Sequence, residues 1–330
     1  MNIAIISAAH IHVDQYCKDI VAECGAPYVI WDSDEARGRF YAEKYGGRFE
    51  PDLDKVLADP AVDGFAVCSE NTRHAPLLRR VLPVGKPTFC EKPLTTDPAE
   101  ADEVAALVAK YKTPFSCGYI RSFTSPNLSS LAFAQSGALG RPTHWIYRNA
   151  VHASYGRWFD TPELKWFTEP ELSGGGAMMD IGTHGLHILR LYGGPITAVR
   201  ASSANLSGEY SHLEDWCLIE VRFASGAVGR AEGAWCFTGA PLGLEIIGSK
   251  CSLFREGDKV LYREPNGEAK PVPVVPERPY RIRRLFALVR GELTKEEMAN
   301  DLEAGVAAVH LMAAAFKSVK TGGGWIDISA

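Results

Sequence analysis

Residues 3–20 read IAIISAAHIHVDQYCKDI and join an apolar run to a small-residue turn and a segment with helical periodicity. A buried strand, a tight turn and an amphipathic helix, in that order, begin a parallel α/β sheet. Ser7, Ala9 and His12 occupy the three positions that are glycine in the usual form of this turn. Because alanine disfavours positive φ, we expect the turn to have a different shape. Its small side chains should narrow the approach of a ligand to the backbone without closing it.

The same alternation continues to about residue 120. Short apolar runs recur as YVIW, GFAVCS, PTFCE and PFSCGY, and helical stretches lie between the runs at roughly 12–24, 34–46, 73–82 and 97–111. Strands that alternate with helices predict a parallel sheet covered on both faces. We therefore expect an α/β fold that opens with a doubly wound Rossmann domain over residues 1–120.

Beyond about residue 140 the strands lengthen and are separated by Gly, Ser and Asn turns. Their alternating apolar and polar residues predict a mostly antiparallel sheet with one solvated or subunit-covered face. We expect residues 121–330 to form a C-terminal α/β domain with a large open sheet, for substrate binding and oligomerisation, whose C-terminal segment can pack back on the first domain. The predicted strands are 142–153, 196–207, 215–226, 227–237, 242–250 and 251–264, the predicted helices lie near 182–192 and 298–320, and the proline-rich 263–279 is a loop or an edge strand.

Composition excludes several classes of function. The net charge of −5 argues against a nucleic-acid partner, and the basic run RPYRIRR at 278–284 is expected to be a solvated loop or a substrate rim. The eight cysteines have no C-x-x-C or metal-finger spacing, which favours reduced thiols in the cytoplasm. There is no signal-like opening and no apolar run of about 18 residues, so no membrane partner is expected.

The spacing from the first turn to Asp32 indicates a dinucleotide ligand. Asp32 ends the second predicted strand about 20 residues after the turn, where an acid accepts hydrogen bonds from the adenosine ribose and repels a 2′-phosphate. This predicts NAD in preference to NADP, with capping of the next helix as the alternative role. His10 and His12 are expected to contact phosphate or the nicotinamide ribose, or else to pack the helix start. The predicted cofactor contacts in the turn are Ser7, Ala8, Ala9, His10, Ile11 and His12.

Two later stretches resemble one enzyme family. GKPTFCEKPLTTDPAEADEV, residues 85–104, carries Glu91-Lys92-Pro93, and WFTEPELSGGGAMMDIGTHGLHILRLYGG, residues 166–194, carries Asp180 and His184. With SENTRHAPLLRRVLPVGK, GYIRSF and SGALG, they resemble the glucose–fructose oxidoreductase/inositol dehydrogenase (Gfo/Idh/MocA) family over essentially the whole chain. The resemblance implies hydride transfer between NAD(P) and a secondary alcohol of a sugar, sugar derivative or cyclitol, in a homodimer or homotetramer.

The resemblance implies that Lys92, Asp180 and His184 are catalytic. A histidine titrates near neutral pH and can take the hydroxyl proton, while a lysine ammonium stabilises the developing alkoxide. Asp180 and His184 are four residues apart and would share one helical face. We expect Lys92 and His184 to converge on one alcohol oxygen, and the preceding triple glycine to keep that backbone close to a ligand.

The remaining site residues follow from their positions in the family's pattern. Ser69-Glu70-Asn71 replaces a common Thr-Pro-Asn beside the nicotinamide ribose, and His187 stands where many relatives have aspartate. No metal is expected, although Asp180, His184 and His187 could be read as a metal cluster. Besides the turn and Asp32, the predicted cofactor contacts are Ser69, Glu70, Asn71, His74, Glu91 and Lys92. The predicted substrate contacts are Lys92, Tyr119, Arg121, Arg157, Trp158, Trp166, Asp180 and His184, with core packing as the alternative for both tryptophans.

Three functions fit this sequence. The leading hypothesis is an NAD(P)-dependent dehydrogenase. A second is an enzyme that holds NAD tightly and uses transient oxidation for elimination, epimerisation or glycoside cleavage. A third is a catalytically silent ligand-binding or regulatory protein, suggested by the missing glycines and by His187. The presence of Lys92, Asp180 and His184 together favours an enzyme.

Overall fold

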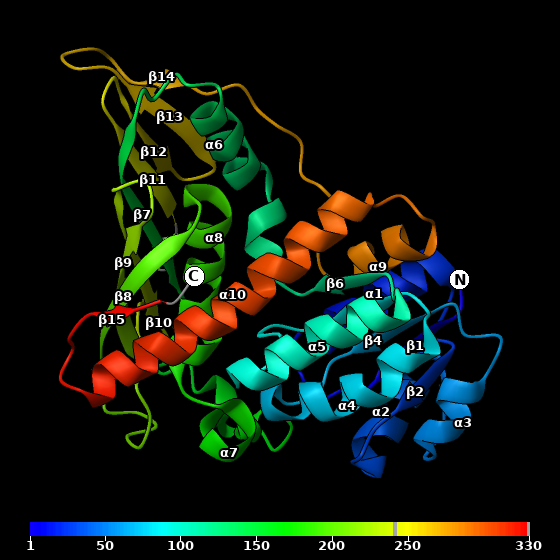
Figure 1. Ribbon diagram of the computed structural model, residues 1–330. Helices are drawn as coiled ribbons and strands as arrows, with labels where there is room; N and C mark the ends of the chain where they lie inside the picture. Colours follow the sequence, from blue (N-terminus) through cyan, green and yellow to red (C-terminus); the bar gives the residue numbers. More distant parts are fainter. Residues whose placement is uncertain (240–242, 329–330) are drawn as a thin grey trace. The chain divides into compact units, whose positions relative to one another are not determined.

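The computed structural model describes residues 1–239 and 243–328, which form two compact units (Figure 1). Unit 1 consists of Met1–Tyr119, Phe159–Gly174 and Pro279–Val309. Unit 2 consists of Ile120–Trp158, Gly175–Arg278 and the chain from His310 onward. Two segments that follow residue 120 therefore belong to the first unit.

Unit 1 contains the predicted Rossmann sheet. Its six strands in the described residues have the order β3-β2-β1-β4-β5-β6, and every pairing is parallel. The order reverses between β1 and β4, which is the switch point where doubly wound sheets bind ligands. The strands are β1 (Ile3–Ile6), β2 (Val29–Trp31), β3 (Arg48–Phe49), β4 (Gly64–Val67), β5 (Thr88–Cys90) and β6 (Phe115–Cys117).

Alternate residues of β1 face two different helical layers. Ile3 and Ile5 pack in a core with α1, α2 and α9, whereas Ala4 and Ile6 pack with α3, α4, α5 and the first half of α10. This alternation is the period of two that a strand buried on both faces requires. The helices are α1 (Val13–Cys24), α2 (Glu35–Tyr45), α3 (Leu53–Ala58), α4 (His74–Val81), α5 (Pro98–Tyr111), α7 (Pro170–Ser173), α9 (Ile282–Val289) and α10 (Lys295–Lys320).

The start of α5 follows from its sequence. The Asp97 side chain accepts a hydrogen bond from the Glu100 backbone N–H at 3.1 Å, and Pro98 occupies the first helical turn. Both features satisfy or remove backbone donors that a helix start leaves unpaired. The prediction of a helix at 97–111 is confirmed.

Unit 2 contains the predicted large sheet. In the described residues it has nine strands in the order β14-β13-β12-β11-β7-β10-β9-β8-β15, and β7 with β10 is its one parallel pair. The proline-rich segment supplies the edge strand β14, as expected, and residue 242 of the predicted strand 242–250 lies outside the described residues. The strands are β7 (Pro142–Ala150), β8 (Ile196–Ala204), β9 (Trp216–Phe223), β10 (Val228–Ala234), β11 (Gly243–Gly248), β12 (Ser252–Glu256), β13 (Lys259–Arg263), β14 (Lys270–Pro271) and β15 (Ile326–Asp327).

Helix α8 (Thr183–Gly193) packs closely on this sheet, and α6 (Ser125–Gln135) is a helix that the sequence analysis missed. A Cβ atom on Gly185 would lie 2.5 Å from the Cβ of Ala231 in β10. Leu186 and Leu189 of α8 are fully buried in the core of unit 2. The glycine therefore allows the helix and the strand to approach, and α8 is fixed firmly on β10.

Helix α10 contributes to the cores of both units. Among the described residues it is the one helix long and apolar enough to cross a membrane, and half of its most apolar window is buried. Ala308 and Val309 belong to the core of unit 1, and Leu311 and Met312 to that of unit 2. These contacts are those of a core helix.

The basic segment at 278–284 is not a solvated loop throughout. Arg284 is buried in α9, where its guanidinium lies 3.3 Å from the Asp301 carboxylate and donates to the Ser116 hydroxyl at 2.7 Å. Burial raises the pKa of Asp301 above its ordinary value, although Arg284 opposes this shift. The expectation of a solvated loop was wrong for Arg284 because this buried ion pair was not visible in the sequence.

The triple glycine before Asp180 makes room for protein atoms. A Cβ on Gly176 would lie 2.2 Å from the carbonyl oxygen of Glu214. The backbone N–H groups of Gly176 and Met178 donate to Glu214 Oε1 at 2.8 and 3.2 Å. The close neighbour of the backbone at Gly176 is therefore Glu214, and the approach of this segment to a ligand stays a prediction.

We predict that Gly176→Ala destabilises the protein by about 1–3 kcal/mol, because the added methyl group must push the backbone away from Glu214. Thermal unfolding of the variant should show a lower midpoint. Gly324→Ala is the matched control, since a Cβ there meets no atom within 4 Å. Equal midpoints for both variants would contradict this explanation of the glycine.

Candidate functional site

The glycine-poor turn keeps a left-handed residue at its first position. Ser7 has a φ of 68°, a conformation that glycine adopts most easily. Ala8 and Ala9 do not have positive φ. Ser7 therefore provides the left-handed bend of the turn, whose shape the alanines were expected to change. The His10 backbone N–H donates to the Cys68 carbonyl at 3.0 Å, which ties the turn to the end of β4.

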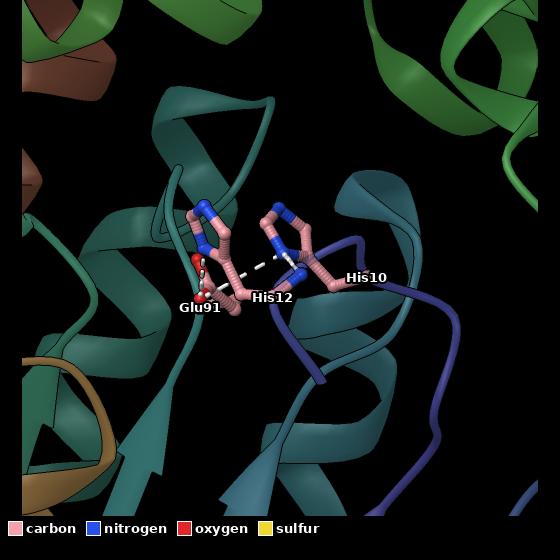
Figure 2. A group of neighbouring side chains, drawn as sticks. All are labelled: His10, His12 and Glu91. Carbon is pink, nitrogen blue, oxygen red and sulfur yellow. Dashed lines mark hydrogen bonds and ion pairs between the residues drawn. The ribbon is translucent and has the colours of Figure 1, made fainter. Parts of the chain in front are cut away.

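A buried carboxylate at the end of β5 gathers residues from the first turn and α1 (Figure 2). Glu91 Oε1 lies 3.0 Å from His12 Nδ1 and 3.7 Å from His10 Nδ1, and it accepts a short hydrogen bond from the Tyr16 hydroxyl. Glu91 Oε2 accepts from the Lys92 backbone N–H at 2.9 Å. Glu91 is fully buried, and these contacts fix the geometry of the chain immediately before Lys92.

The protonation states within this group follow from burial and from the partners. Burial lowers the pKa of His10 well below its ordinary value, against the attraction of Glu91. Burial alone would raise the pKa of the Glu91 carboxyl, but the imidazoles of His10 and His12 and the Lys92 ammonium hold it well below its ordinary value. Burial and the Glu91 charge raise the pKa of Tyr16. At neutral pH the group therefore consists of a carboxylate, a phenol and a neutral His10.

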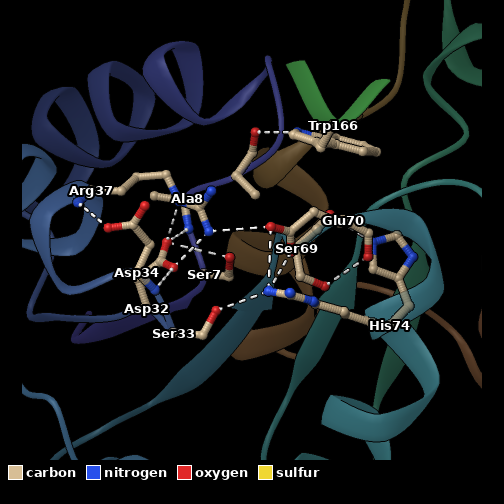
Figure 3. Close-up of polar contacts among 12 residues, drawn as sticks. Ser7, Ala8, Asp32, Ser33, Asp34, Arg37, Ser69, Glu70, His74 and Trp166 are labelled. Atoms are coloured by element: carbon tan, nitrogen blue, oxygen red, sulfur yellow. Dashed lines mark hydrogen bonds and ion pairs between the residues drawn. The ribbon is translucent and has the colours of Figure 1, made fainter. Parts of the chain in front are cut away.

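Asp32 is buried and fully occupied by protein donors (Figure 3). Its Oδ2 accepts from the Ala8 N–H at 2.6 Å, Arg37 Nε at 2.8 Å and the Ser7 hydroxyl at 3.3 Å. Its Oδ1 accepts from the Asp34 N–H at 2.8 Å and Arg37 Nη2 at 2.7 Å. Since a carboxylate has about four acceptor sites, another donor can reach Asp32 only by displacing one of these groups.

Asp32 is also not the cap of α2. That cap is Asp34, whose side chain accepts from the Arg37 backbone N–H at 3.1 Å. The alternative role for Asp32 is therefore taken by its neighbour. Asp32 instead braces the first turn through Ser7 and Ala8.

The segment after β4 lies at the switch point and is buried from Ser69 to Asn71. The Glu70 carboxylate lies 3.4 Å from the guanidinium groups of both Arg37 and Arg73. The His74 ring contacts the Pro93 carbonyl through Nδ1 at 2.8 Å and the Ser69 carbonyl through Nε2 at 3.2 Å. His74 thus joins this segment to the one that carries Lys92.

Residues 159–174 of unit 1 pack over the first turn and the segment after β4. The Trp166 indole donates to the Ala9 carbonyl at 3.0 Å and stacks on Phe167 at 4.0 Å between centroids. The Asn71 amide donates to the Ser173 carbonyl at 2.8 Å. Trp166 is only 4% exposed, and its contact with a substrate stays a prediction.

Unit 2 fixes Asp180 through a second indole. Asp180 lies in a π-helical turn, Met178–Gly182, and its Oδ2 accepts from Trp235 Nε1 at 2.8 Å. Such turns occur frequently at functional sites. His184 follows in α8 and is buried, and His187 Nδ1 lies 2.8 Å from the Ser122 hydroxyl. His187 therefore has a hydroxyl neighbour and is placed by packing and by Ser122.

The other predicted substrate residues have varied surroundings. Tyr119 is buried in the core of unit 1. Arg121 is half-buried, and within the described chain its Nε has no hydrogen-bond partner. Arg157 forms an ion pair with Glu209, and Trp158 packs against His152 with ring centroids 4.9 Å apart. Lys92 belongs to unit 1 and His184 to unit 2, and their convergence on one alcohol oxygen stays a prediction.

One group of possible metal ligands occurs among the described residues. Ligand atoms of His10, His12 and Glu91 lie within 4.8 Å of one another. Asp180, His184 and His187 do not form such a group in this part of the chain. The interpretation of Asp180, His184 and His187 as a metal cluster therefore gains no support from the geometry.

Comparison with known proteins identifies the family. Residues 2–119 match the family model described as "Oxidoreductase family, NAD-binding Rossmann fold", and residues 132–254 match "GFO/IDH/MocA C-terminal domain". The chain belongs to the Gfo/Idh/MocA family. Its members among curated proteins include dehydrogenases and reductases, so this chain belongs to a family of NAD-binding oxidoreductases.

Several Gfo/Idh/MocA relatives match most of the chain. A 1,5-anhydro-D-fructose reductase of Ensifer adhaerens is 28% identical over 80% of this chain and 77% of its own length. A D-glucoside 3-dehydrogenase of Escherichia coli is 26% identical over 98% and 96%. The crystal structure of an inositol dehydrogenase homologue of Azotobacter vinelandii with NAD⁺ has a TM-score of 0.84 at 19% identity, over 99% of this chain and 97% of that one. This structural likeness supports the two-domain Gfo/Idh/MocA fold.

Four residues at the site were missed by the sequence analysis. Tyr16 contacts the buried Glu91 and Arg37 the buried Asp32, both in unit 1, while Trp235 and Glu214 fix the Asp180 turn in unit 2. Tyr16 was detectable, because it lies one helical turn after His12 on the same face of α1. The other three depend on contacts that no local pattern specifies.

We predict that Ser7→Gly is more stable than Ser7→Ala by about 1 kcal/mol. Both variants lose the hydroxyl contact with Asp32, but only alanine retains a Cβ in the left-handed region. Chemical denaturation of the two variants measures this difference directly. If alanine were the more stable, the left-handed turn at residue 7 would be wrong.

Proposed function

We propose that this protein is an NAD-dependent dehydrogenase that oxidises a secondary alcohol of a sugar, sugar derivative or cyclitol. The observation that carries the proposal is the position of Lys92, directly after β5 and beside the ionised, buried Glu91. Lys92 follows the carboxyl end of a strand on one side of the switch point, the edge where doubly wound sheets bind ligands. The names of the relatives, an anhydrofructose reductase and a glucoside dehydrogenase, support this substrate class.

In the proposed reaction the bound nicotinamide supplies the hydride acceptor. The Lys92 ammonium donates a hydrogen bond to the substrate oxygen and stabilises the negative charge that grows as the carbon–hydrogen bond breaks. His184 takes the hydroxyl proton, so that the hydride pair and the proton leave in balance. Asp180, held by the Trp235 indole, orients the hydroxyl or the imidazole. Glu91 positions Lys92 through the backbone N–H of that residue.

The residues around the switch point fit a dinucleotide. The turn before α1 has small side chains at Ser7, Ala8 and Ala9. A phosphate can therefore approach the backbone N–H groups at the start of the helix. His10 Nε2 and Asn71 Oδ1 are buried and, within the described chain, have no hydrogen-bond partner. The adenosine ribose is proposed to bind at Asp32 after Arg37 has moved, and the nicotinamide half beyond β4, near Ser69, Asn71 and Glu91.

We further propose cytoplasmic localisation and a homodimer or homotetramer. All eight cysteines are free in the structure, as in a reducing compartment. The large sheet of unit 2 has a cavity of about 340 Å³, and Val228, which is 40% exposed, is one of the residues that line it. A second subunit would cover this surface. Sedimentation of the purified protein tests the oligomer.

We predict that the purified protein reduces NAD when given a methyl glucoside or myo-inositol, or oxidises NADH with 1,5-anhydrofructose. Lys92→Met should lower kcat by about 10²–10⁴-fold because the alkoxide loses its stabilising charge, with NAD affinity retained. Lys110→Met, on an exposed helix face, is the matched control.

The assay also separates the competing functions. Product formation without net NADH would favour the tightly held cofactor and transient oxidation. Binding of NAD and sugar with no turnover on any substrate would favour the silent protein. Full activity of Lys92→Met would contradict the mechanism.

We predict that Arg37 controls the access of the adenosine ribose to the Asp32 carboxylate. Arg37→Ala frees the Asp32 carboxylate for ribose hydroxyls and removes the cation nearest a 2′-phosphate. The ratio of the dissociation constants should shift about tenfold towards NAD, the value of one charge-assisted hydrogen bond. Titrations of NAD and NADP measure it.

Arg39→Ala provides the control for this experiment. Arg39 lies on the same helix, is paired with Glu35 and is exposed. Its loss should leave the NAD to NADP ratio unchanged. A ratio that does not respond to Arg37→Ala would place the ribose away from Asp32.

A further inference from the structure

The two histidines of the first turn have their inner nitrogens occupied. The His12 backbone N–H donates to His10 Nδ1 at 3.3 Å, so His10 Nδ1 is an acceptor and carries no proton. His12 Nδ1 lies 3.0 Å from Glu91 Oε1, and a carboxylate can only accept, so His12 Nδ1 carries its proton. When both rings are neutral, their tautomers are therefore opposite.

The outer nitrogens then have complementary hydrogen-bonding roles. In the neutral rings, His10 presents an Nε2–H donor and His12 an Nε2 lone pair. Figure 2 shows the two rings side by side, with both outer nitrogens turned away from Glu91. The ring centroids are 4.6 Å apart. A single small polar group can therefore contact both rings.

His10 Nε2 indicates that something binds there. His10 is 1% exposed, and no described residue accepts a hydrogen bond from its Nε2. A buried donor without a partner is costly, and native structures rarely retain one without a ligand or water. The His12 side chain is 22% exposed, so a ligand can reach the pair from that side.

We propose that His10 and His12 form a donor–acceptor pair that binds a neutral group of the nicotinamide half of the cofactor, either the carboxamide or a ribose hydroxyl. The inference rests on the proposed function and extends it. Both candidate groups accept one hydrogen bond and donate another. Phosphate fits poorly, because it has only acceptors to offer and would face the His12 lone pair beside the Glu91 carboxylate.

The position in the sheet favours the nicotinamide half. A doubly wound sheet binds one half of a dinucleotide on each side of the switch point. Asp32 follows β2, on the side of β1, whereas Glu91 follows β5, on the side of β4. His12 contacts Glu91, so the pair is directed towards the β4–β5 side.

A divalent metal on the inner nitrogens is the competing occupant. The Nδ1 atoms and Glu91 Oε1 are close enough for shared coordination after small rotations. Such a metal would break the His12–Glu91 and His12–His10 hydrogen bonds and would leave the His10 Nε2–H without a partner. The observed contacts therefore favour a ligand on the outer nitrogens.

Asparagine and glutamine variants of the full-length protein separate the two nitrogens of each ring. Asparagine reproduces the Nδ1 position and removes Nε2, whereas glutamine reproduces Nε2. We expect His10→Asn and His12→Asn each to weaken NAD binding about tenfold in calorimetric titrations, the value of one lost hydrogen bond. His12→Gln should restore part of the affinity, and AMP should bind equally well to all variants. His144→Asn, an exposed histidine of β7, is the control.

ADP-ribose separates the two candidate groups. If a ribose hydroxyl is bound, His12→Asn weakens ADP-ribose by the same factor as NAD. If the carboxamide is bound, ADP-ribose affinity is unchanged. Unchanged NAD affinity in both asparagine variants would overturn the pair and leave the proposed function intact. Wild-type protein that binds neither NAD nor NADP would overturn both.

The tautomers are measurable without any variant. Long-range ¹H–¹⁵N spectra of histidine-labelled protein should show a proton on His10 Nε2 and on His12 Nδ1, and NAD should shift the outer nitrogens. The opposite tautomers would overturn the proposal. One-to-one Zn²⁺ binding would also overturn the proposal if His10→Asn and His12→Asn retained it while His10→Ala and His12→Ala lost it. That result would assign the inner nitrogens to a metal.

Discussion

The site of unit 1 depends on the buried carboxylate of Glu91. An ionised carboxylate without partners in the protein interior costs many kcal/mol, so its position requires donors from several directions. Tyr16 of α1, His12 of the first turn and the Lys92 backbone N–H supply them. A single charge therefore links the end of β5 to the turn after β1. Lys92 acquires a fixed backbone because the residue before it cannot move without losing these bonds.

The first turn forms without glycines because each glycine of the usual turn has a separate role, and another residue can take that role. Positive φ is provided by Ser7, whose strained conformation is supported by the Asp32 carboxylate through two contacts. Close approach is provided by the alanines. At the third position, a glycine would allow close packing of helix on strand. Here His12 instead sends its side chain to Glu91, and Tyr16, one turn later, fills the same region of α1.

Local patterns predicted the parallel and the mostly antiparallel sheet but not the contacts between residues far apart in the chain. Periodicity, caps such as Asp97 and the two motifs gave the Rossmann domain, the antiparallel sheet and the family. The packing of residues 159–174 in unit 1 was not predicted, because it depends on the Trp166 hydrogen bond to Ala9, across more than 150 residues. The close neighbour of Gly176 was not predicted for the same reason. That neighbour, Glu214, comes from a distant loop.

The two sides of the switch point differ in whether protein groups already fill the hydrogen-bonding positions that a ligand would use. At Asp32 every acceptor position is already filled by protein donors, so a ribose exchanges one hydrogen bond for another and gains little net free energy. At His10 Nε2 and Asn71 Oδ1, no described residue provides a partner, so a ligand removes an existing cost of desolvation. Affinity for a dinucleotide should therefore come mainly from the β4–β5 side. In the proposed function, discrimination between NAD and NADP is assigned to the Asp32–Arg37 pair.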